Sequence, residues 1–369
     1  PEYMQKIRTC IRTVLSALQG TPYPISYEEQ ETVLHSYMCR MYGDSWMETK
    51  KPYPFFVGPN SIPLQLDNVV ENTEGLSSVV NIRKDYTVTE KADGERALLY
   101  IAKDGRIYMI TYSLKVVFTG SKTKEKRCFD SVLDGEFIMF GKNKKRLFLY
   151  AAFDIYYFGG MEKDAHVRPL PFATNDETAL EDKYRLSLLK KFHEMLKLES
   201  VTANSKCDFS MRVKHFETCQ ENKQSIFEAC SRVWEKHEHF DYEIDGLIFT
   251  PMKSGVGGTR MGEANEITGK KFTWRHSFKW KPPKYNTIDF LVTTEKDKDG
   301  KDLIRNIVHD QDTSMSAVTQ YKTLILWCGL DKKKHKFMNP FDDVLYDNVP
   351  KQPKGHDDEE KYEVKRFVP

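Results

Sequence analysis

A chain of 369 residues, 40% of them apolar, is long enough for two or three domains with real cores. The 56 Lys and Arg residues nearly balance the 54 Asp and Glu residues, so any nucleic-acid surface must be a local patch. The seven cysteines include no Cys-x-x-Cys pair, which argues against a disulfide framework or a zinc site. No apolar run approaches the roughly 20 residues of a membrane span and no signal peptide is visible, so we expect a cytoplasmic protein with no membrane contact.

Residues 1–52 are expected to form an N-terminal helical segment. Apolar residues recur at helical spacing before Gly20, which follows as a stop. A second helix is predicted from Ser26, with Glu29 completing a capping box, to near Gly43. Its inward face should carry Val33, Leu34, Tyr37, Met38 and Met41. We interpret the two helices as a pair that packs over the next domain.

From about residue 53 the sequence changes to short runs typical of β-strands. Three of them cover residues 86–90, 97–101 and 106–110, and the Asp104-Gly105 pair predicts a hairpin between the last two. Further strands are predicted at 131–140, 147–157, 242–249 and 277–280, and two helices at 186–196 and 226–234. The pattern predicts an α+β domain over residues 53–283, with antiparallel sheets flanked by helices.

A new unit is expected after Pro282-Pro283. Runs at 288–292 and 303–308 around Asp299-Gly300 predict a second hairpin system. The apolar stretch 317–330 fits a helix or a strand equally well. One further short apolar run follows at 362–368.

The most informative segment runs from Glu90 to Arg96 and reads Glu-Lys-Ala-Asp-Gly-Glu-Arg. It places Lys91 at the end of a strand, before a turn with glycine. A nucleophilic lysine must be neutral, and a nearby cation such as Arg96 lowers a lysine pKa toward that state. Taken alone, the segment also fits an ordinary solvated hairpin.

Four later segments favour the catalytic interpretation of the segment around Lys91. They are Leu133-Asp-Gly-Glu136, Tyr150-Ala-Ala-Phe-Asp-Ile155, Asp245-Gly-Leu-Ile-Phe-Thr-Pro251 and Phe278-Lys-Trp-Lys-Pro282. Each has an unremarkable alternative, such as a solvated strand end, a core aromatic, a turn aspartate or an exposed strand face. In this order, however, the set resembles motifs I, III, IIIa, IV and V of the covalent nucleotidyltransferase superfamily, which includes mRNA capping guanylyltransferases and polynucleotide ligases. The resemblance spans residues 91 to 282, about half the chain.

The resemblance implies a role for each residue that matches a motif. Lys91 would attack the α-phosphate of a nucleotide and hold it as a phosphoramidate, while Arg96 and Glu136 would contact the ribose and phosphates. Phe153 would stack on the purine. Asp245 would help to hold a divalent metal, Mg²⁺ or Mn²⁺.

The fifth of these segments, which resembles motif V, contributes two lysines. Lys279 and Lys281 lie two residues apart, so in a strand they share one face. The resemblance implies that they grip the α-phosphate as negative charge builds on it.

The branch of the superfamily is indicated by the fourth and fifth motifs. Asp245-Gly and Lys279-Trp-Lys-Pro282 resemble capping enzymes, whereas ligases usually have Glu-Gly and lack the Trp. The resemblance therefore implies GTP as substrate, a covalent enzyme–GMP and transfer to a 5′-diphosphate RNA end. An ATP-dependent polynucleotide ligase that adenylates Lys91 is the alternative, and a noncatalytic module that binds RNA or a partner is another. The family's arginine on the strand after the first hairpin is missing, so either Arg106 substitutes for it or the contact is absent.

Among these enzymes, the sequence most resembles the multifunctional capping enzymes of large cytoplasmic DNA viruses, such as the African swine fever virus group. That resemblance implies a triphosphatase upstream and a methyltransferase downstream, with action in the host cytoplasm. It also implies an OB-fold domain over residues 284–369. The family's last motif finds no match before Pro369, so this domain is expected to be truncated.

Two weaker patterns remain. The glycine-rich segment 255–262 fits no phosphate loop and predicts a mobile loop near the site. Basic runs at 122–127, 142–146 and 332–336 fit either a path for an RNA 5′ end or solvated hairpin tips.

Overall fold

The computed structural model describes residues 2–43, 56–71, 79–161, 164–176, 181–202, 207–218, 225–260, 262–267, 272–285, 290–309, 317–330 and 363–366. Contacts within the chain divide it into two compact units, Pro1–Tyr285 and Asn286–Pro369.

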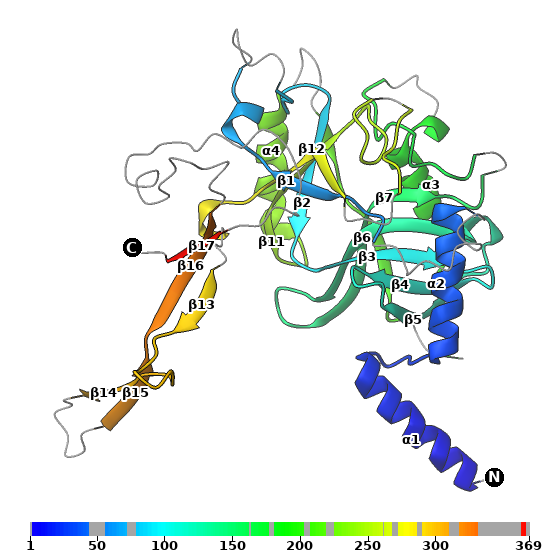
Figure 1. Cartoon of the computed structure of the whole chain (residues 1–369). Helices are drawn as coiled ribbons and strands as arrows, with labels where there is room; N and C mark the ends of the chain where they lie inside the picture. Colours follow the sequence, from blue (N-terminus) through cyan, green and yellow to red (C-terminus); the bar gives the residue numbers. More distant parts are fainter. Residues whose placement is uncertain are drawn as a thin grey trace. The chain divides into compact units, whose positions relative to one another are not determined.

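The first unit is built on two β-sheets (Figure 1). The five-stranded sheet has the order β1 (Asn60–Pro63), β12 (Thr273–Trp280), β11 (Ile244–Pro251), β2 (Tyr86–Ala92) and β10 (Glu217–Thr218). The seven-stranded sheet has the order β8 (Glu199–Ser200), β5 (Val116–Lys122), β4 (Arg106–Thr111), β3 (Glu95–Ile101), β6 (Ser131–Phe140), β7 (Arg146–Tyr157) and β9 (Ser210–Val213). Most pairs are antiparallel, and β1–β12 and β7–β9 are parallel. The predicted α+β class is confirmed.

The turn after Lys91 takes the chain from one sheet to the other. Strand β2 pairs with β10 and β11, whereas β3 pairs with β4 and β6, so the two strands do not form a hairpin with each other. Gly94 makes this crossing possible, because a Cβ there would lie 2.6 Å from the Phe137 carbonyl oxygen. The predicted hairpin at Asp104-Gly105 is confirmed as β3–β4.

Helix α3 (Arg185–Met195) packs on the seven-stranded sheet and helix α4 (Ile226–Glu235) on the five-stranded sheet. Helix α3 buries Leu188, Leu189 and Phe192 in a core with β3, β6 and β7. Helix α4 buries Ile226 and Val233 against β2, β11 and β12, and a capping box at Ser225 begins it. Short 3₁₀ turns complete the described elements: η2 (Leu66–Asn68), η3 (Lys126–Cys128), η4 (Glu181–Lys183), η5 (Lys236–His239) and η6 (Pro283–Tyr285).

The N-terminal helices differ in their packing. Helix α2 (Tyr27–Tyr42) buries the five predicted residues in the core that also holds β3, β4 and β5. Ser26 caps it by accepting from the Glu29 N–H, but the Glu29 side chain accepts from Arg106 and Tyr108, so the predicted capping box is only half formed.

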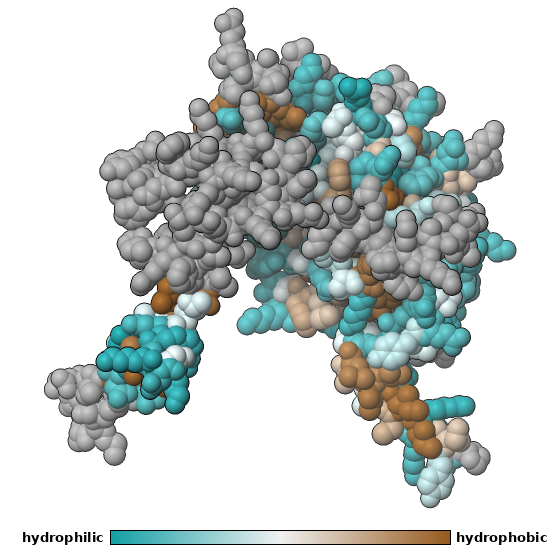
Figure 2. Space-filling model, in the orientation of Figure 1, coloured by the Kyte–Doolittle hydropathy of each residue, from teal (hydrophilic) through white to brown (hydrophobic). Residues whose placement is uncertain are grey.

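Helix α1 (Glu2–Gln19) keeps the apolar stripe that the sequence predicts, but the stripe is not packed against a domain. Its residues are exposed in the described part of the chain, for example Met4 at 56% and Leu18 at 67%. Figure 2 shows this apolar surface on the helix. The predicted helix pair covering the next domain is therefore found for α2 alone. No described helix is both long and apolar enough to cross a membrane.

The second unit has two small sheets in its described part. Strands β13 (Leu291–Thr294), β16 (Leu324–Leu330) and β17 (Glu363–Arg366) form one, and β14 (Ile304–His309) with β15 (Ala317–Lys322) forms the other. The stretch 317–330, which fitted helix or strand, is two strands. The expected hairpin around Asp299-Gly300 is found as a short turn, closed by an antiparallel bridge between Lys296 and Asp302. The longer strands on either side pair elsewhere, β13 with β16 and β14 with β15. The OB-fold stays a prediction.

Candidate nucleotide site

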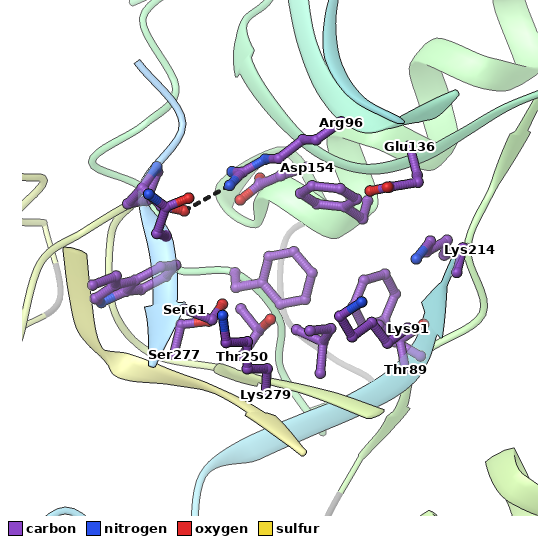
Figure 3. A pocket seen from close by; sticks show the side chains of 18 of the residues that line it. Ser61, Thr89, Lys91, Arg96, Glu136, Asp154, Lys214, Thr250, Ser277 and Lys279 are labelled. Carbon is purple, nitrogen blue, oxygen red and sulfur yellow. Dashed lines mark hydrogen bonds between the residues drawn. The ribbon is translucent and has the colours of Figure 1, made fainter. Parts of the chain in front are cut away.

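A cavity of about 260 Å³ lies between the two sheets of the first unit. The five-stranded sheet contributes Lys91, Ile248, Thr250, Ser277 and Lys279 to its lining, and the seven-stranded sheet contributes Arg96, Glu136, Phe153, Asp154 and Tyr156. In Figure 3, Arg96, Glu136 and Asp154 line one wall, and Ser277, Thr250 and Lys279 line the opposite wall. Five of the predicted site residues thus line one cavity, although they are spread over nearly 190 residues of sequence.

Lys91 lies at one end of this cavity, one residue before the end of β2. Its Nζ donates to Oδ1 of Asp245 at 2.7 Å, and the other oxygen, Oδ2, lies 2.6 Å from Nζ of Lys281. Asp245 lies where the β2–β11 register shifts between Ile244 and Gly246, which is a bulge that re-aims a side chain. Burial alone would raise the pKa of Asp245, but the hydrogen bonds and charges of the two lysines lower it. One ionised carboxylate therefore holds two cations together.

Lys279 lies in β12 and Lys281 follows one residue after its end, so the shared strand face stays a prediction. Lys279 lines the cavity, whereas Lys281 reaches the site through Asp245. Partial burial lowers the pKa of Lys279, and the charges of Lys91 and Lys281 lower it further. Gly246 allows β12 to approach, because a Cβ there would lie 1.9 Å from the Trp280 carbonyl oxygen. Three ammonium groups and one carboxylate thus form a net positive end suited to phosphate.

Arg96 is held by a buried carboxylate that the sequence analysis did not select. Its Nε and Nη2 donate to Asp134 at 3.1 and 2.5 Å, and Nη1 donates to the Pro59 carbonyl. Asp134 is fully buried and also accepts from the Tyr156 hydroxyl. Burial works against the charge of Arg96, but Asp134 outweighs it and raises the pKa of the guanidinium. This fork fixes a permanent cation in the cavity wall.

Phe153 contacts two cations in the cavity wall. The guanidinium carbon of Arg96 is 5.5 Å from the ring centroid, and Nζ of Lys214 is 5.6 Å from it. Glu136 lines the same wall, and burial raises its pKa against the opposing charges of Lys214, Arg96 and Lys91. The ring is half-buried, so one part of it remains available to stack on a planar base.

Lys214 is the main functional candidate that the sequence analysis missed. Its side chain is 4% exposed, and Nζ donates to the Glu90 carbonyl at 3.0 Å and lies 3.8 Å from the Glu90 carboxylate. Its backbone N–H donates to Ala152, next to Phe153, and this places the side chain in the cavity. No motif marks it; the only signal is a lysine in the β-type run Ser210-Met-Arg-Val-Lys-His215.

Residues 255–260 of the glycine-rich segment are folded against the far end of the cavity rather than forming an open loop there. Val256 is fully buried and its N–H donates to the Arg168 carbonyl, and the Gly258 carbonyl accepts from the indole N–H of Trp274. Trp274 lines the cavity. Arg106, the candidate substitute for the missing arginine, donates to Glu29 and is not among the residues that line the cavity.

A divalent metal fits the lysine end of the cavity only if substrate phosphates and water supply most of its ligands. The described residues contain no group of three or more His, Cys, Asp or Glu side chains able to hold an ion by themselves. Mg²⁺, however, is usually bound by one or two carboxylates together with substrate phosphates and water. Asp245 offers one such carboxylate beside the cations that would hold the phosphates.

Comparison with known proteins assigns the chain to a family. The family model "mRNA capping enzyme, catalytic domain" matches residues 28–282. A probable mRNA-capping enzyme of Acanthamoeba polyphaga mimivirus is 25% identical over 87% of this chain and 27% of its own length. The mRNA-capping enzyme of Danio rerio is 25% identical over 72% of this chain and 42% of its own length. That of African swine fever virus is 27% identical over 56% of this chain and 18% of its own length.

This chain therefore spans less than half the length of each of these relatives. Among solved structures, the ligase domain of M. tuberculosis LigD aligns over 74% of this chain and 68% of that chain, with 11% identity and a TM-score of 0.33. The resemblance predicted from five motifs is confirmed by the family match, and the chain belongs to the mRNA capping enzyme catalytic domain family.

Proposed function

We propose that this chain is an mRNA guanylyltransferase that loads GMP onto Lys91 and passes it to an RNA 5′ end. The observation that carries the proposal is the cavity between the sheets. It brings Lys91, Lys279 and Asp245 to one end and Phe153 to the wall. A nucleoside triphosphate needs this combination of cations for its phosphates and an aromatic face for its base.

In the first step, Nζ of Lys91 attacks the α-phosphorus of GTP. The N–P bond forms, the bond from that phosphorus to the bridging oxygen of the β-phosphate breaks, and pyrophosphate leaves. The Lys91 ammonium gives up one proton before the attack and a second as the N–P bond forms, so the phosphoramidate keeps one N–H. Asp245, 2.7 Å away, is the nearest described acceptor for the first proton, and the second passes to water. Lys279 neutralises charge on the phosphate as it builds.

In the second step, a terminal oxygen of a 5′-diphosphate RNA attacks the same phosphorus. The P–O bond forms as the P–N bond breaks, and Lys91 regains a proton. The product is the GpppN cap. In this proposal Arg96 and Glu136 hold the ribose and phosphates through both steps, supported by their position in the cavity lining and by the Arg96–Asp134 hydrogen bonds.

A bound Mg²⁺ or Mn²⁺ would neutralise charge on the triphosphate, and Asp245 is the residue that would hold it. The OB-fold domain over residues 284–369, its truncation, and the fused triphosphatase and methyltransferase belong to the proposal. So does action in the host cytoplasm.

Label transfer tests the proposal against its two rivals. The chain is incubated with Mg²⁺ and α-³²P-labelled GTP or ATP, denatured, and examined for labelled protein. We expect label from GTP alone, absent in Lys91→Ala and retained in Lys103→Ala, an exposed lysine at the β3–β4 turn. Label from ATP would indicate the ligase, and no label from either nucleotide would contradict catalysis and favour a binding module.

A further inference from the structure

We propose that the tip of the β6–β7 hairpin, residues 139–146, receives the RNA acceptor beside the nucleotide site. This hairpin tip lines no part of the nucleotide cavity. The inference rests on the proposed function for the identity of the acceptor, since RNA is the substrate only if Lys91 carries GMP.

The hairpin tip combines exposed aromatic and apolar surface with positive charge. Phe140 is 57% exposed and Met139 is 38% exposed. Both lie where the β6–β7 register shifts between Ile138 and Phe140, directly after the mostly buried part of β6. A single exposed apolar residue needs no explanation, but one set among cations is the pattern of single-strand binding surfaces, in which bases stack and phosphates are neutralised.

The charge is concentrated and largely unopposed along the chain. Lys142, Lys144, Lys145 and Arg146 lie within five residues, and no acidic residue occurs from 137 to 153. Lys142 donates to the His237 carbonyl and Arg146 lies 4.8 Å from the Phe148 ring centroid, so both are fixed in place. Lys144 and Lys145 are exposed at the turn. On a chain whose net charge is only +2, this is a local positive patch.

The hairpin tip is attached to the segment that carries Asp245. The Lys142 N–H donates to the Asp241 carbonyl, and a Cβ on Gly141 would lie 2.6 Å from that same oxygen. Asp241 itself pairs with Arg212, so its carboxylate already has a cation. Four residues further on, Asp245 contacts Lys91.

The hairpin tip is also within reach of the cavity along β6. Glu136 lines the cavity, and Phe140 lies four residues further along the strand, about 13 Å at the usual rise of a β-strand. A 5′ diphosphate and the first nucleotides of an RNA can span that distance. With the terminal phosphate at Lys91, the first bases would therefore reach Phe140 and the following phosphates would reach Lys144 and Lys145.

The test separates the two steps of the reaction. Enzyme–GMP is formed first and then chased with a 5′-diphosphate RNA oligonucleotide, and binding of the same RNA is measured in parallel by fluorescence anisotropy. The variants are Phe140→Ser and the double variant K144E/K145E. The control, K103E/K126E, makes the same charge change at two exposed lysines near the opposite end of the same sheet, where Ile101 pairs with Ser131.

We expect enzyme–GMP formation to stay unchanged in all variants, while KM and Kd for RNA rise at least 10-fold in K144E/K145E and less in Phe140→Ser. The slope of log Kd against log salt should fall by about 0.7 for each lost phosphate contact, roughly 1.4 for the pair. Equal effects in K144E/K145E and K103E/K126E would overturn the inference. If wild-type chain takes no label but its RNA binding depends on the hairpin tip, the proposed guanylyltransferase fails while the RNA surface stands.

Discussion

Lys91 and Asp245 meet across the paired strands β2 and β11, with Nζ 2.7 Å from Oδ1. The second oxygen of the same carboxylate holds Lys281. A single residue on a bulged strand thus sets the position of the nucleophile and of one lysine that the resemblance assigns to the α-phosphate. The charge of Asp245 is therefore the most direct test of how this end of the cavity works.

Asp245→Asn keeps the size of the side chain and removes its charge. We expect the rate of enzyme–GMP formation to fall by about 100-fold or more, the usual effect of losing one preorganised electrostatic group. The measurement is the initial rate of label transfer from GTP at saturating Mg²⁺. Asp241→Asn, which changes an exposed carboxylate paired with Arg212, is the matched control and should react at the wild-type rate. An unchanged rate in Asp245→Asn would remove Asp245 from the mechanism.

Lys279 should give the nucleotide affinity an alkaline limit. Its lowered pKa means that it loses its proton at a lower pH than an ordinary lysine, and its attraction for phosphate goes with the proton. KM for GTP should therefore rise on the alkaline side, below the pH at which an ordinary lysine titrates. Lys279→Arg, which stays charged, should shift that rise upward. Identical pH profiles for wild type and Lys279→Arg would contradict this.

The same pKa predicts that Lys279 opposes folding. A cation whose pKa is lower in the folded chain than in the unfolded chain destabilises the fold below that pKa, and the cost disappears as pH rises through the folded pKa toward the unfolded value. Near neutral pH, Lys279→Met should therefore have an equal or higher Tm than wild type while losing GMP transfer. Thermal unfolding at neutral and alkaline pH measures this. A clear fall in Tm at neutral pH would show that Lys279 stabilises the chain.

Local patterns in the sequence predicted most of the elements of the first unit. The strand at 131–140 matches β6, and the helices at 186–196 and 226–234 match α3 and α4 within one residue at each end. These succeed because periodicity is a property of neighbouring residues. The chain's crossing between sheets after Lys91 was not predictable, because strand pairing is decided by residues far away in the sequence.

The site shows the same division between local and distant information. The residues predicted from the five motifs either line the cavity or contact residues that line it. The order of the motifs along the chain was enough to predict them. Asp134 lies within one of the motifs, but nothing in the neighbouring sequence indicates that its carboxylate faces Arg96. Lys214 lies outside every motif, and only its position after β9, beside β7, brings it to the cavity. The exposed stripe of α1 could not be distinguished in sequence from a buried one.

The Arg96–Asp134 pair should be important for stability as well as for the site. Asp134→Asn leaves a cation in the cavity wall without its carboxylate, and breaking a buried pair in this way costs about 3–5 kcal/mol. Tyr156→Phe removes only a hydroxyl that donates to the same carboxylate, and a lost hydrogen bond costs about 1 kcal/mol. Urea unfolding of both variants gives the comparison. Equal losses would mean that the charge of Asp134 contributes little to the free energy of unfolding.

Lys214 is predicted to select the base. Guanine presents the acceptors O6 and N7 on one edge, whereas adenine presents an amino donor in place of O6. With Nζ of Lys214 only 5.6 Å from the Phe153 ring centroid, a base stacked on Phe153 would bring that edge near an ammonium donor. One hydrogen bond to a charged group contributes about 1.5–3 kcal/mol. Lys214→Met should therefore reduce the preference for GTP over ATP in label transfer by about 10-fold or more.

The experiment on Lys214 must separate a change in nucleotide selectivity from a loss of folding stability. Glu90 is 1% exposed and accepts from Tyr242, and Lys214 is the cation beside its carboxylate. Lys214→Met alone strands that charge, so its Tm should fall. The double variant E90Q/K214M removes the stranded charge and should recover much of the Tm while keeping the weakened GTP preference. If E90Q/K214M recovered both, the selectivity would come from the packing around Glu90, and Lys214 would have no direct part in reading the base.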